Sequence, residues 1–321
     1  MTMIRVENLV KSFGAKRAVD DISFSVERGE VLGFLGPNGA GKSTTMRIVT
    51  GFYPPTSGRV LVGGFDIVED PLPAKRLVGY LPENAPAYAD MTVHGFLSFA
   101  AELRGLTGDG RKQAINRVVE LCHLDRVLYQ SIDTLSKGYK HRTCLAQSLI
   151  HDPDILILDE PTDGLDPNQK HEARELIKRM GEKKAIVFST HILEEVEQAC
   201  TRVIIIDRGK IVADGTPQEL KARSELAGAV RVSTRSVGAA ALTGKLSGLA
   251  SRTEVLVDDG AQVVARAYPR ERGANGAFAG SIAQLAQREN WALDEIHIEE
   301  GRLDEVFRSI TLPDTVKGGP A

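Results

Sequence analysis

The sequence predicts an α/β fold with a parallel sheet, and three observations lead to this prediction. A short apolar strand at 30–35 leads into a glycine-rich loop, and a helix at 44–50 follows it. The run Ile155–Leu158 is aliphatic at every position, which is typical of a central strand in a parallel sheet. Further short strands alternate with helical stretches up to about residue 222, as they do in α/β domains.

The composition is that of an ordinary globular protein. The 321 residues are 42% hydrophobic and 26% charged, and 40 basic against 43 acidic side chains give a formal net charge of −3. We therefore expect no nucleic-acid partner, because such a partner usually binds a basic surface. The chain shows neither a signal peptide nor an apolar run of roughly 18–20 residues, so we expect a cytoplasmic protein. Cys122, Cys144 and Cys200 lack metal or redox spacing, and we expect inert thiols.

Two strands and a turn precede the glycine-rich loop. Residues 3–10 alternate between apolar and polar side chains, and a second strand is expected at 19–26. Phe13 lies in the turn that joins them. The position of Phe13, taken alone, favours a side chain in the core. The alternative is that its ring stacks on a nucleotide base.

The glycine-rich loop carries the most specific site pattern. Gly36, Gly41, Lys42 and Ser43 fit G-x-x-x-x-G-K-[ST], the phosphate-loop pattern, and the alternative is a turn that binds nothing. Glycines let backbone amides face an anion, and the helix that follows adds its positive end. We expect Lys42 to reach the β- and γ-phosphates and the Ser43 hydroxyl to ligate Mg²⁺. The whole predicted loop consists of Gly36, Pro37, Asn38, Gly39, Ala40, Gly41, Lys42, Ser43 and Thr44.

The middle of the chain changes from strands to helices. A hairpin is expected around Gly63-Gly64, and the strand 78–81 leads into a proline-bounded loop that contains Glu83. From Thr92 the apolar residues follow a helical period and fall on one face, namely Val93, Phe96, Leu97, Ala100 and Leu103. Helices are also expected at 111–123 and 139–150, so 88–150 reads as a helical insertion.

Polar residues follow the next two strands. Ile155–Leu158 ends in Asp159-Glu160, and the strand 185–188 ends in Ser189-Thr190-His191. Asp159 could hold Mg²⁺ through water, Glu160 could polarise an attacking water, and His191 could contact a γ-phosphate. The alternatives are a helix-cap turn for the acidic pair and a structural role for His191.

The remaining elements complete the first domain and form a second one. Helices are expected at 168–180 and 192–200, then a hairpin of 203–206 and 211–213, and a capped helix start at Thr216. The last part reads as a small α+β domain over 223–312, with a tail at 313–321 that we expect to be disordered. Its expected elements are strand 229–235, helix 237–247, strands 252–257 and 262–267, helix 277–289, strand 292–299 and helix 302–310.

The order of these motifs resembles that of the ATP-binding cassette (ABC) ATPases, the motor subunits of ABC transporters. The resemblance covers residues 2–222. It rests on Phe13 (aromatic loop that stacks on the nucleotide base), Gly36–Thr44 (Walker A), Glu83 (Q-loop position), Leu135–Tyr139 (signature), Ile155–Glu160 (Walker B and catalytic glutamate), Gly164–Asp166 (D-loop) and His191 (switch histidine). Tyr80–Glu83 and Arg302–Phe307 resemble the exporter branch whose ATPase pairs with a separate permease.

This resemblance implies a P-loop NTPase fold of the ABC type with a helical subdomain, and ATP and Mg²⁺ as cofactors. Two copies, most simply a homodimer, would close head to tail over two ATPs and drive a membrane permease from its cytoplasmic side. Ser136 and Gly138 would face the partner's γ-phosphate, and Asp166 would link the two sites. Catalysis would fall to Lys42, Glu160 and His191, and metal binding to Ser43, Asp159 and Glu83.

Two positions depart from the family pattern. Glu83 replaces the usual glutamine, and it would either ligate Mg²⁺ or face the permease. Lys137 replaces a signature glycine, and it would either help to bind ATP or remain solvated. Because the catalytic glutamate and the histidine are both present, we expect an active ATPase.

Two other function classes remain as alternatives. A non-transport ABC ATPase of translation or DNA repair would usually carry two cassettes or a long coiled-coil insertion, and this chain has neither pattern. The other class is a regulatory subunit that binds ATP without hydrolysing it, and Glu83 is the only feature in favour of this class. The sequence does not identify the transported substrate, the permease or the role of the C-terminal domain.

Overall fold

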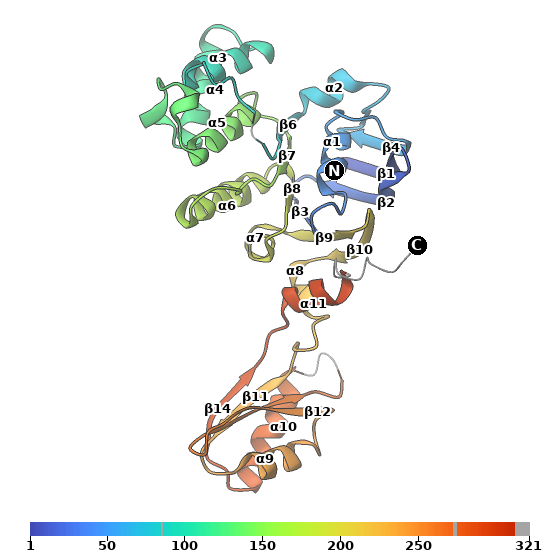
Figure 1. The fold of residues 1–321 in the computed structure, drawn as a ribbon, viewed down its shortest axis with the longest axis vertical. Coiled ribbons are helices and arrows are strands. Elements are labelled where there is room, and N and C mark those ends of the chain that lie inside the picture. The colour runs from blue at the N-terminus through green and yellow to red at the C-terminus, as the bar shows by residue number, and fades with distance from the viewer. Residues whose placement is uncertain (85, 272–274, 312–321) are drawn as a thin grey trace. The chain divides into compact units, whose positions relative to one another are not determined.

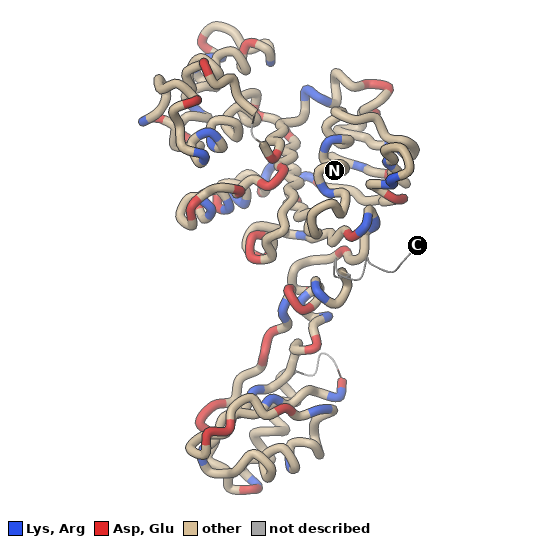
Figure 2. The backbone as a smooth tube through the Cα atoms, viewed as in Figure 1, with Lys and Arg blue, Asp and Glu red and all other residues tan. Residues whose placement is uncertain are grey.

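A computed structural model describes residues 1–84, 86–271 and 275–311 (Figure 1). The chain divides into two units, Met1–Pro217 and Gln218–Ala321, and each is described by itself below. The domain boundary at residue 222 stays a prediction, and the tail at 313–321 lies outside the described residues. Basic and acidic side chains are interspersed in both units (Figure 2). No described helix has both the length and the apolar content that a membrane crossing requires.

The first unit contains an antiparallel sheet with the strand order β2-β1-β4-β5. Its strands are β1 (Thr2–Phe13), β2 (Lys16–Glu27), β4 (Ser57–Val62) and β5 (Phe65–Asp66). The alternation in β1 buries Ile4, Val6 and Leu9, as the period-two pattern predicts. The hairpin predicted at Gly63-Gly64 joins β4 and β5.

A six-stranded sheet with the order β10-β9-β3-β8-β7-β6 forms the centre of this unit. Its strands are β3 (Val31–Leu35), β6 (Val78–Leu81), β7 (Ile155–Asp159), β8 (Ala185–Thr190), β9 (Arg202–Asp207) and β10 (Lys210–Gly215). The prediction of a central parallel strand is confirmed, since β7 pairs in parallel with both β6 and β8. Ile155 and Ile157 pack into one hydrophobic cluster, whereas Leu156 and Leu158 pack into another. Burial on both faces explains why the run is apolar throughout.

Three helices pack against the central sheet, and each follows one of the strands β3, β7 and β8 in the sequence. They are α1 (Lys42–Val49), α6 (Pro167–Gly181) and α7 (Leu193–Ala199). No helix was predicted at α2 (Pro71–Arg76). Pro71 stands at the first helical position, where the absent N–H costs nothing.

A group of three helices forms the helical insertion (Figure 1). These helices are α3 (Val93–Leu103), α4 (Gly108–Leu121) and α5 (Lys137–Leu149), with single 3₁₀ turns at Asp125–Val127 and Ile132–Thr134 between α4 and α5. Thr92 caps α3 by accepting a hydrogen bond from the Gly95 amide at 3.0 Å. Four of the five apolar residues predicted for one face of α3 are buried, but Leu103 is exposed at the helix end.

The second unit is an α+β fold, as predicted. An antiparallel sheet with the order β12-β13-β11-β14 packs one face against α9 and α10 (Figure 1). Its elements are α8 (Pro217–Lys221), β11 (Val230–Thr234), α9 (Ala239–Leu246), β12 (Arg252–Asp258), β13 (Val263–Tyr268), α10 (Asn275–Arg288), β14 (Leu293–Ile298) and α11 (Leu303–Ile310).

Candidate active site

The phosphate loop lines a cavity of about 470 Å³ in the first unit. We call this the nucleotide cavity. It brings together segments that are far apart in the sequence, because β3, β7 and β8 all end at the same edge of the central sheet. Its lining residues are Phe13, Lys16, Ala18, Asn38, Gly39, Gly41, Lys42, Ser43, Thr44, Glu83 and Glu160.

Two loop glycines are required by the local geometry. Gly41 has φ +113°, and a Cβ there would lie 2.6 Å from the Ala18 carbonyl oxygen. A Cβ at Gly36 would lie 2.3 Å from the Ile206 carbonyl oxygen. Gly41 is also the N-cap of α1, and no side chain caps this helix. The first amides of α1 are therefore available to an anion.

Lys42 is buried at the floor of the loop. Its Nζ donates hydrogen bonds to the carbonyl oxygens of Gly36 at 2.8 Å and Pro37 at 3.3 Å. The same atom lies 4.0 Å from Glu160 Oε1. Burial lowers the pKa of Lys42, and the nearby carboxylates oppose that shift. The hydrogen bonds to Gly36 and Pro37 hold the ammonium group inside the loop, where a bound phosphate would lie.

Asp159 provides a position that fits a divalent cation. Ser43 Oγ donates a hydrogen bond to Asp159 Oδ1 at 3.1 Å, and Ser189 Oγ donates to the same oxygen. Asp159 Oδ2 is buried and has no hydrogen-bond partner among the described residues. Mg²⁺ is usually held by one or two carboxylates together with substrate phosphates and water, so this pair fits the metal. Glu83 lines the same cavity with an exposed side chain.

Glu160 faces His191 across the end of the sheet. His191 Nδ1 lies 3.0 Å and 3.2 Å from the two Glu160 carboxylate oxygens. Glu160 has φ +51°, a conformation that a non-glycine residue adopts only when its surroundings hold it there. Burial raises the pKa of the Glu160 carboxyl, which His191 and Lys42 oppose. A carboxylate with a raised pKa beside a phosphate site is suited to accept a proton from water.

The core position that Phe13 favours by its place in the sequence alone is wrong, because 46% of its surface is exposed, and the base-stacking role that the family resemblance implies stays a prediction. Its ring stands edge-on to Tyr53 with the ring centres 5.6 Å apart, and Lys11 Nζ lies 5.1 Å from its centre. Lys11 Nζ also donates to the Pro54 carbonyl oxygen at 2.7 Å. These contacts hold the ring at the cavity, where it can stack on a base.

Replacing Phe13 with alanine should weaken ATP binding by about 10- to 100-fold, because base–aromatic stacking is worth about 1–3 kcal/mol. Phe13→Tyr keeps the ring and should bind like the wild type. Equilibrium titration with ATP in the presence of Mg²⁺ measures both. Equal affinity for Phe13→Ala and wild type would show that the ring does not contact the base.

The remaining predicted site residues do not line the nucleotide cavity. Ser136 is the exposed N-cap of α5 and accepts from the Tyr139 amide at 3.4 Å. Asp166 is the exposed N-cap of α6 and accepts from the Gln169 amide at 2.9 Å. Gly138 is buried, and a Cβ there would lie 2.5 Å from Gln169 Oε1.

Lys137, the departure in the signature, forms an ion pair within the chain. Its Nζ lies 2.8 Å from Asp163 Oδ2, and its aliphatic part lies against Gly164. The Lys137 side chain is itself 67% exposed, so this is a surface ion pair, and the two alternatives for Lys137 stay predictions.

Sequence reasoning missed Lys16, Ala18 and Ser189. Lys16 and Ala18 line the nucleotide cavity from the start of β2. Ser189 Oγ contacts both acidic neighbours, since it donates to Asp159 Oδ1 and accepts from the Glu160 amide at 3.2 Å. The position of Ser189 at a strand end beside His191 is the sequence pattern that could have identified it.

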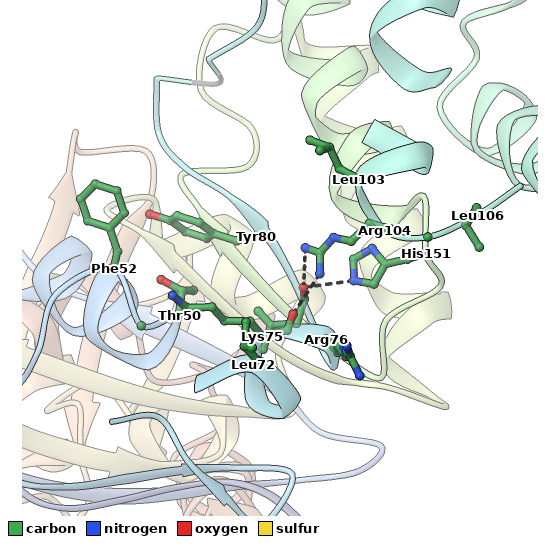
Figure 3. A pocket seen from close by; sticks show the side chains of 13 residues that line it. Thr50, Phe52, Leu72, Lys75, Arg76, Tyr80, Leu103, Arg104, Leu106 and His151 are labelled. Carbon is green, nitrogen blue, oxygen red and sulfur yellow. Dashed lines mark hydrogen bonds between the residues drawn. The ribbon is translucent and has the colours of Figure 1, made fainter. Parts of the chain in front are cut away.

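A second cavity of about 880 Å³ lies between the central sheet and the helical insertion (Figure 3). We call it the helical-side cavity. Three large apolar side chains stand at it with most of their surface exposed, namely Phe52 at 67%, Leu72 at 70% and Leu103 at 71%. Its lining also includes Lys75, Arg76, Arg104 and His151, and no Asp or Glu among the described residues.

Arg104 and His151 hold the wall of this cavity together. The Arg104 guanidinium donates to the carbonyl oxygens of Lys75 at 2.9 Å and Val78 at 3.2 Å (Figure 3). His151 Nε2 lies 3.1 Å from the Val78 oxygen, and Nδ1 is buried with no hydrogen-bond partner in the described part of the chain. Burial, with help from the charge of Arg104, lowers the pKa of His151 to about 4. The ring is therefore neutral at pH 7 and donates from Nε2.

Comparison with known proteins shows similarity to one family. The family model described as "ABC transporter" matches residues 19–163. The probable multidrug ABC transporter ATP-binding protein YbhF of Escherichia coli is 42% identical over 224 residues, which are 70% of this chain and 39% of that protein. The linearmycin resistance ATP-binding protein LnrL of Bacillus subtilis is 39% identical over 222 residues, 69% of this chain and 71% of that protein.

A solved structure shows the same fold. The chain described as the ATP-binding subunit of an ABC transporter has a TM-score of 0.64 and 30% sequence identity. The match covers 68% of this chain and 92% of that chain. The predicted P-loop NTPase fold of the ABC type is thereby confirmed.

Proposed function

This chain belongs to the family of ABC transporter ATP-binding proteins, and from that premise we propose that it hydrolyses Mg–ATP to drive a membrane permease. The family binds ATP, and hydrolysis by this chain is the proposed step. Relatives whose names refer to multidrug transport and linearmycin resistance favour export as the direction. We place the protein on the cytoplasmic face of the membrane through its permease.

One observation carries the proposal, namely the convergence of Lys42, Asp159, Glu160 and His191 at one end of the central sheet. Lys42 and Glu160 line one cavity, Asp159 contacts Ser43, and His191 contacts Glu160. A site that only bound nucleotide would not need a buried carboxylate held at a strained backbone position. The arrangement therefore favours a hydrolase over the regulatory binder.

The residues divide the work of hydrolysis between them. The free amides at the start of α1 and the Lys42 ammonium group bind the β- and γ-phosphates. Ser43 and Asp159 would hold Mg²⁺, with Glu83 as the third candidate ligand. When bound, the metal neutralises phosphate charge as the terminal group leaves.

Glu160 is the proposed general base. Its carboxylate accepts a proton from a water that attacks the γ-phosphorus, and the bond between that phosphorus and the bridging oxygen breaks. ADP and inorganic phosphate are the products. His191 holds the carboxylate through Nδ1 and leaves its other ring nitrogen for the γ-phosphate.

We propose that a second copy completes the site. Ser136 is an exposed helix N-cap that does not line its own nucleotide cavity, and Gly138 lies in the first turn of the same helix. A helix N-terminus attracts an anion, so this end of α5 is suited to the γ-phosphate bound by a partner. In the same dimer Asp166 would lie between the two sites.

The helical-side cavity is the proposed docking site of the permease. A cytoplasmic segment with apolar side chains and at least one carboxylate would complement its exposed Phe52, Leu72 and Leu103 and its cationic lining. This cavity is separate from the phosphate loop, so contacts there can transmit movement without contacting ATP.

Replacing Leu72 with aspartate should therefore release the protein from membranes and leave its own ATP turnover unchanged. Losing one buried leucine contact costs about 1.5–3 kcal/mol, which weakens docking by about 10- to 100-fold. The measurement is the fraction of full-length protein that sediments with membranes of its native cells. Val212→Asp changes an exposed valine outside this cavity and serves as the control. Equal sedimentation of both variants would rule out docking here.

Hydrolysis itself is tested with the purified full-length chain. We expect release of phosphate from ATP that requires Mg²⁺ and stops when EDTA is added. A preparation of Lys42→Ala gives the background from contaminating ATPases. Turnover no higher than that background would contradict the proposed activity.

A further inference from the structure

A buried glutamate in the first turn of α7 lies behind the proposed site. Glu195 is 1% exposed and does not line the nucleotide cavity. Each of its carboxylate oxygens accepts a hydrogen bond from a buried threonine. Thr162 Oγ1 donates to Oε1, and Thr190 Oγ1 donates to Oε2 at 2.7 Å. A buried carboxylate is costly unless it is paired, so its presence requires a structural or functional reason.

The two threonines belong to the two segments that carry the proposed chemistry. Thr162 follows Glu160 by two residues, in the turn that leads to α6, and Thr190 immediately precedes His191. These segments are 28 residues apart in the sequence and contact each other through Glu160 and His191. Glu195 therefore connects the same two segments a second time, outside the lining of the nucleotide cavity.

We infer that Glu195 is a positioning residue for ATP hydrolysis. Its carboxylate fixes the turn after Glu160 relative to the strand end before His191, and so fixes the base and its histidine at 3.0 Å from each other. This inference rests on the proposed hydrolysis. It explains how the left-handed backbone of Glu160 is kept in place, since the turn that follows it is anchored at Thr162.

The hydrogen-bond arrangement requires a carboxylate and not an amide. A threonine hydroxyl has a single hydrogen, and Thr190 Oγ1 donates it to Glu195 Oε2 while it accepts from the Ile192 amide at 3.0 Å. A glutamine would offer one oxygen and one NH₂ group, and one of the two threonine hydroxyls would lose its acceptor. A buried hydroxyl without an acceptor moves to find one, and the segment that carries it moves as well.

Lys170 on α6 balances part of the charge. Its Nζ lies 3.8 Å from Glu195 Oε1. The carboxylate thus also ties α6 to the two catalytic segments. Glu195 therefore links Thr190, the residue before His191, to α6 through Lys170. The N-cap of α6 is Asp166, which belongs to the D-loop.

The test compares Glu195→Gln with Glu194→Gln, which changes the neighbouring exposed glutamate on the same helix. Glu195→Gln should lower kcat by about 10- to 100-fold, because small displacements of a catalytic group cost that much. ATP affinity, measured by equilibrium titration, should stay close to the wild-type value, since Lys42 and the amides at the start of α1 are unchanged. Glu194→Gln should match the wild type in both. A fall in kcat without a change in affinity separates positioning from general damage to the fold.

Two further variants keep the test decisive if Glu195→Gln folds poorly. Thr162→Val and Thr190→Val each remove one hydroxyl at nearly constant volume, and each should lower kcat in the same direction. Adding Thr190→Val to Glu195→Gln should cause little further loss, because both changes break one network. Thermal unfolding shows which variants are folded.

Two results are to be distinguished. If the wild type hydrolyses ATP and all three single variants keep its kcat, the positioning role is wrong and the proposed function stands. If the wild type shows no turnover above Lys42→Ala, the proposed function is wrong and the positioning role is overturned with it.

Discussion

Replacing Glu160 with glutamine should lower ATP turnover by about 10²- to 10⁴-fold, the range expected for loss of a general base. Glutamine has the same shape but cannot accept a proton from the attacking water. Burial raises the pKa of the Glu160 carboxyl, so the wild-type group is a better base than an exposed glutamate. The measurement is phosphate release at saturating Mg–ATP.

ATP should remain bound in this variant, because Lys42 and the loop amides are unchanged. Glu175→Gln is the matched control, since Glu175 is exposed on α6. Its turnover should equal that of the wild type. Equal rates for Glu160→Gln and wild type would remove Glu160 from the mechanism, and lost ATP binding would show that Glu160 serves the fold instead.

A negative charge at Ser136 should abolish the ATP-dependent dimer. In the Glu160→Gln background ATP is consumed only slowly, so we expect the sedimentation coefficient to rise from that of a monomer to that of a dimer when Mg–ATP is added. Adding Ser136→Asp should prevent this rise. An aspartate opposite the partner's γ-phosphate places like charges together, which we expect to weaken the dimer by about 100-fold or more.

Aspartate is chosen because it is also a good helix N-cap, so α5 keeps its start. Thr92→Asp is the matched control, since Thr92 caps α3 in the same way and is not part of the signature. The control should dimerise like its parent. A Ser136→Asp variant that dimerises normally, or a parent that stays monomeric with ATP, would contradict a site shared between two copies.

The site residues that the sequence identified best are those whose role depends on near neighbours. The phosphate loop needs a strand, glycines and a helix start within about twenty residues, and each has a local pattern. The acidic pair Asp159-Glu160 was predicted from its position directly after Ile155–Leu158. A strand that is apolar at every position is typical of the centre of a parallel sheet, as β7 is here. In the helical insertion, Thr92 and the apolar period of α3 were enough to place that helix.

Sequence reasoning failed where distant contacts decide. Phe13 looked like a core residue, yet Tyr53, forty residues later, supports its ring at the surface. Leu103 shares the apolar period of α3 but lies at its end, where the helical-side cavity leaves it exposed. No element was predicted between the hairpin at Gly63-Gly64 and the strand at 78–81, where the structure has the helix α2 with Pro71 at its first position.

Glu195 illustrates the same limit most clearly. In the sequence it is one of three glutamates between 194 and 197, and no local pattern distinguishes it from its neighbours. Only the fold shows that it is buried and that Thr162 and Thr190 donate to it.

The sequence by itself determined the family and the α/β class of the first unit, and it predicted the residues that would contact a phosphate, because these depend on short stretches with fixed spacing. The tertiary structure decided which side chains meet. It placed Glu160 beside His191 and kept Ser136 outside the nucleotide cavity of its own chain. It also left Asp159 Oδ2 without a hydrogen-bond partner among the residues that the structure describes. The physical reason is that hydrogen-bond partners and burial depend on strands such as β3 and β8, which pair across more than a hundred residues. A local sequence pattern does not show which distant strands pair.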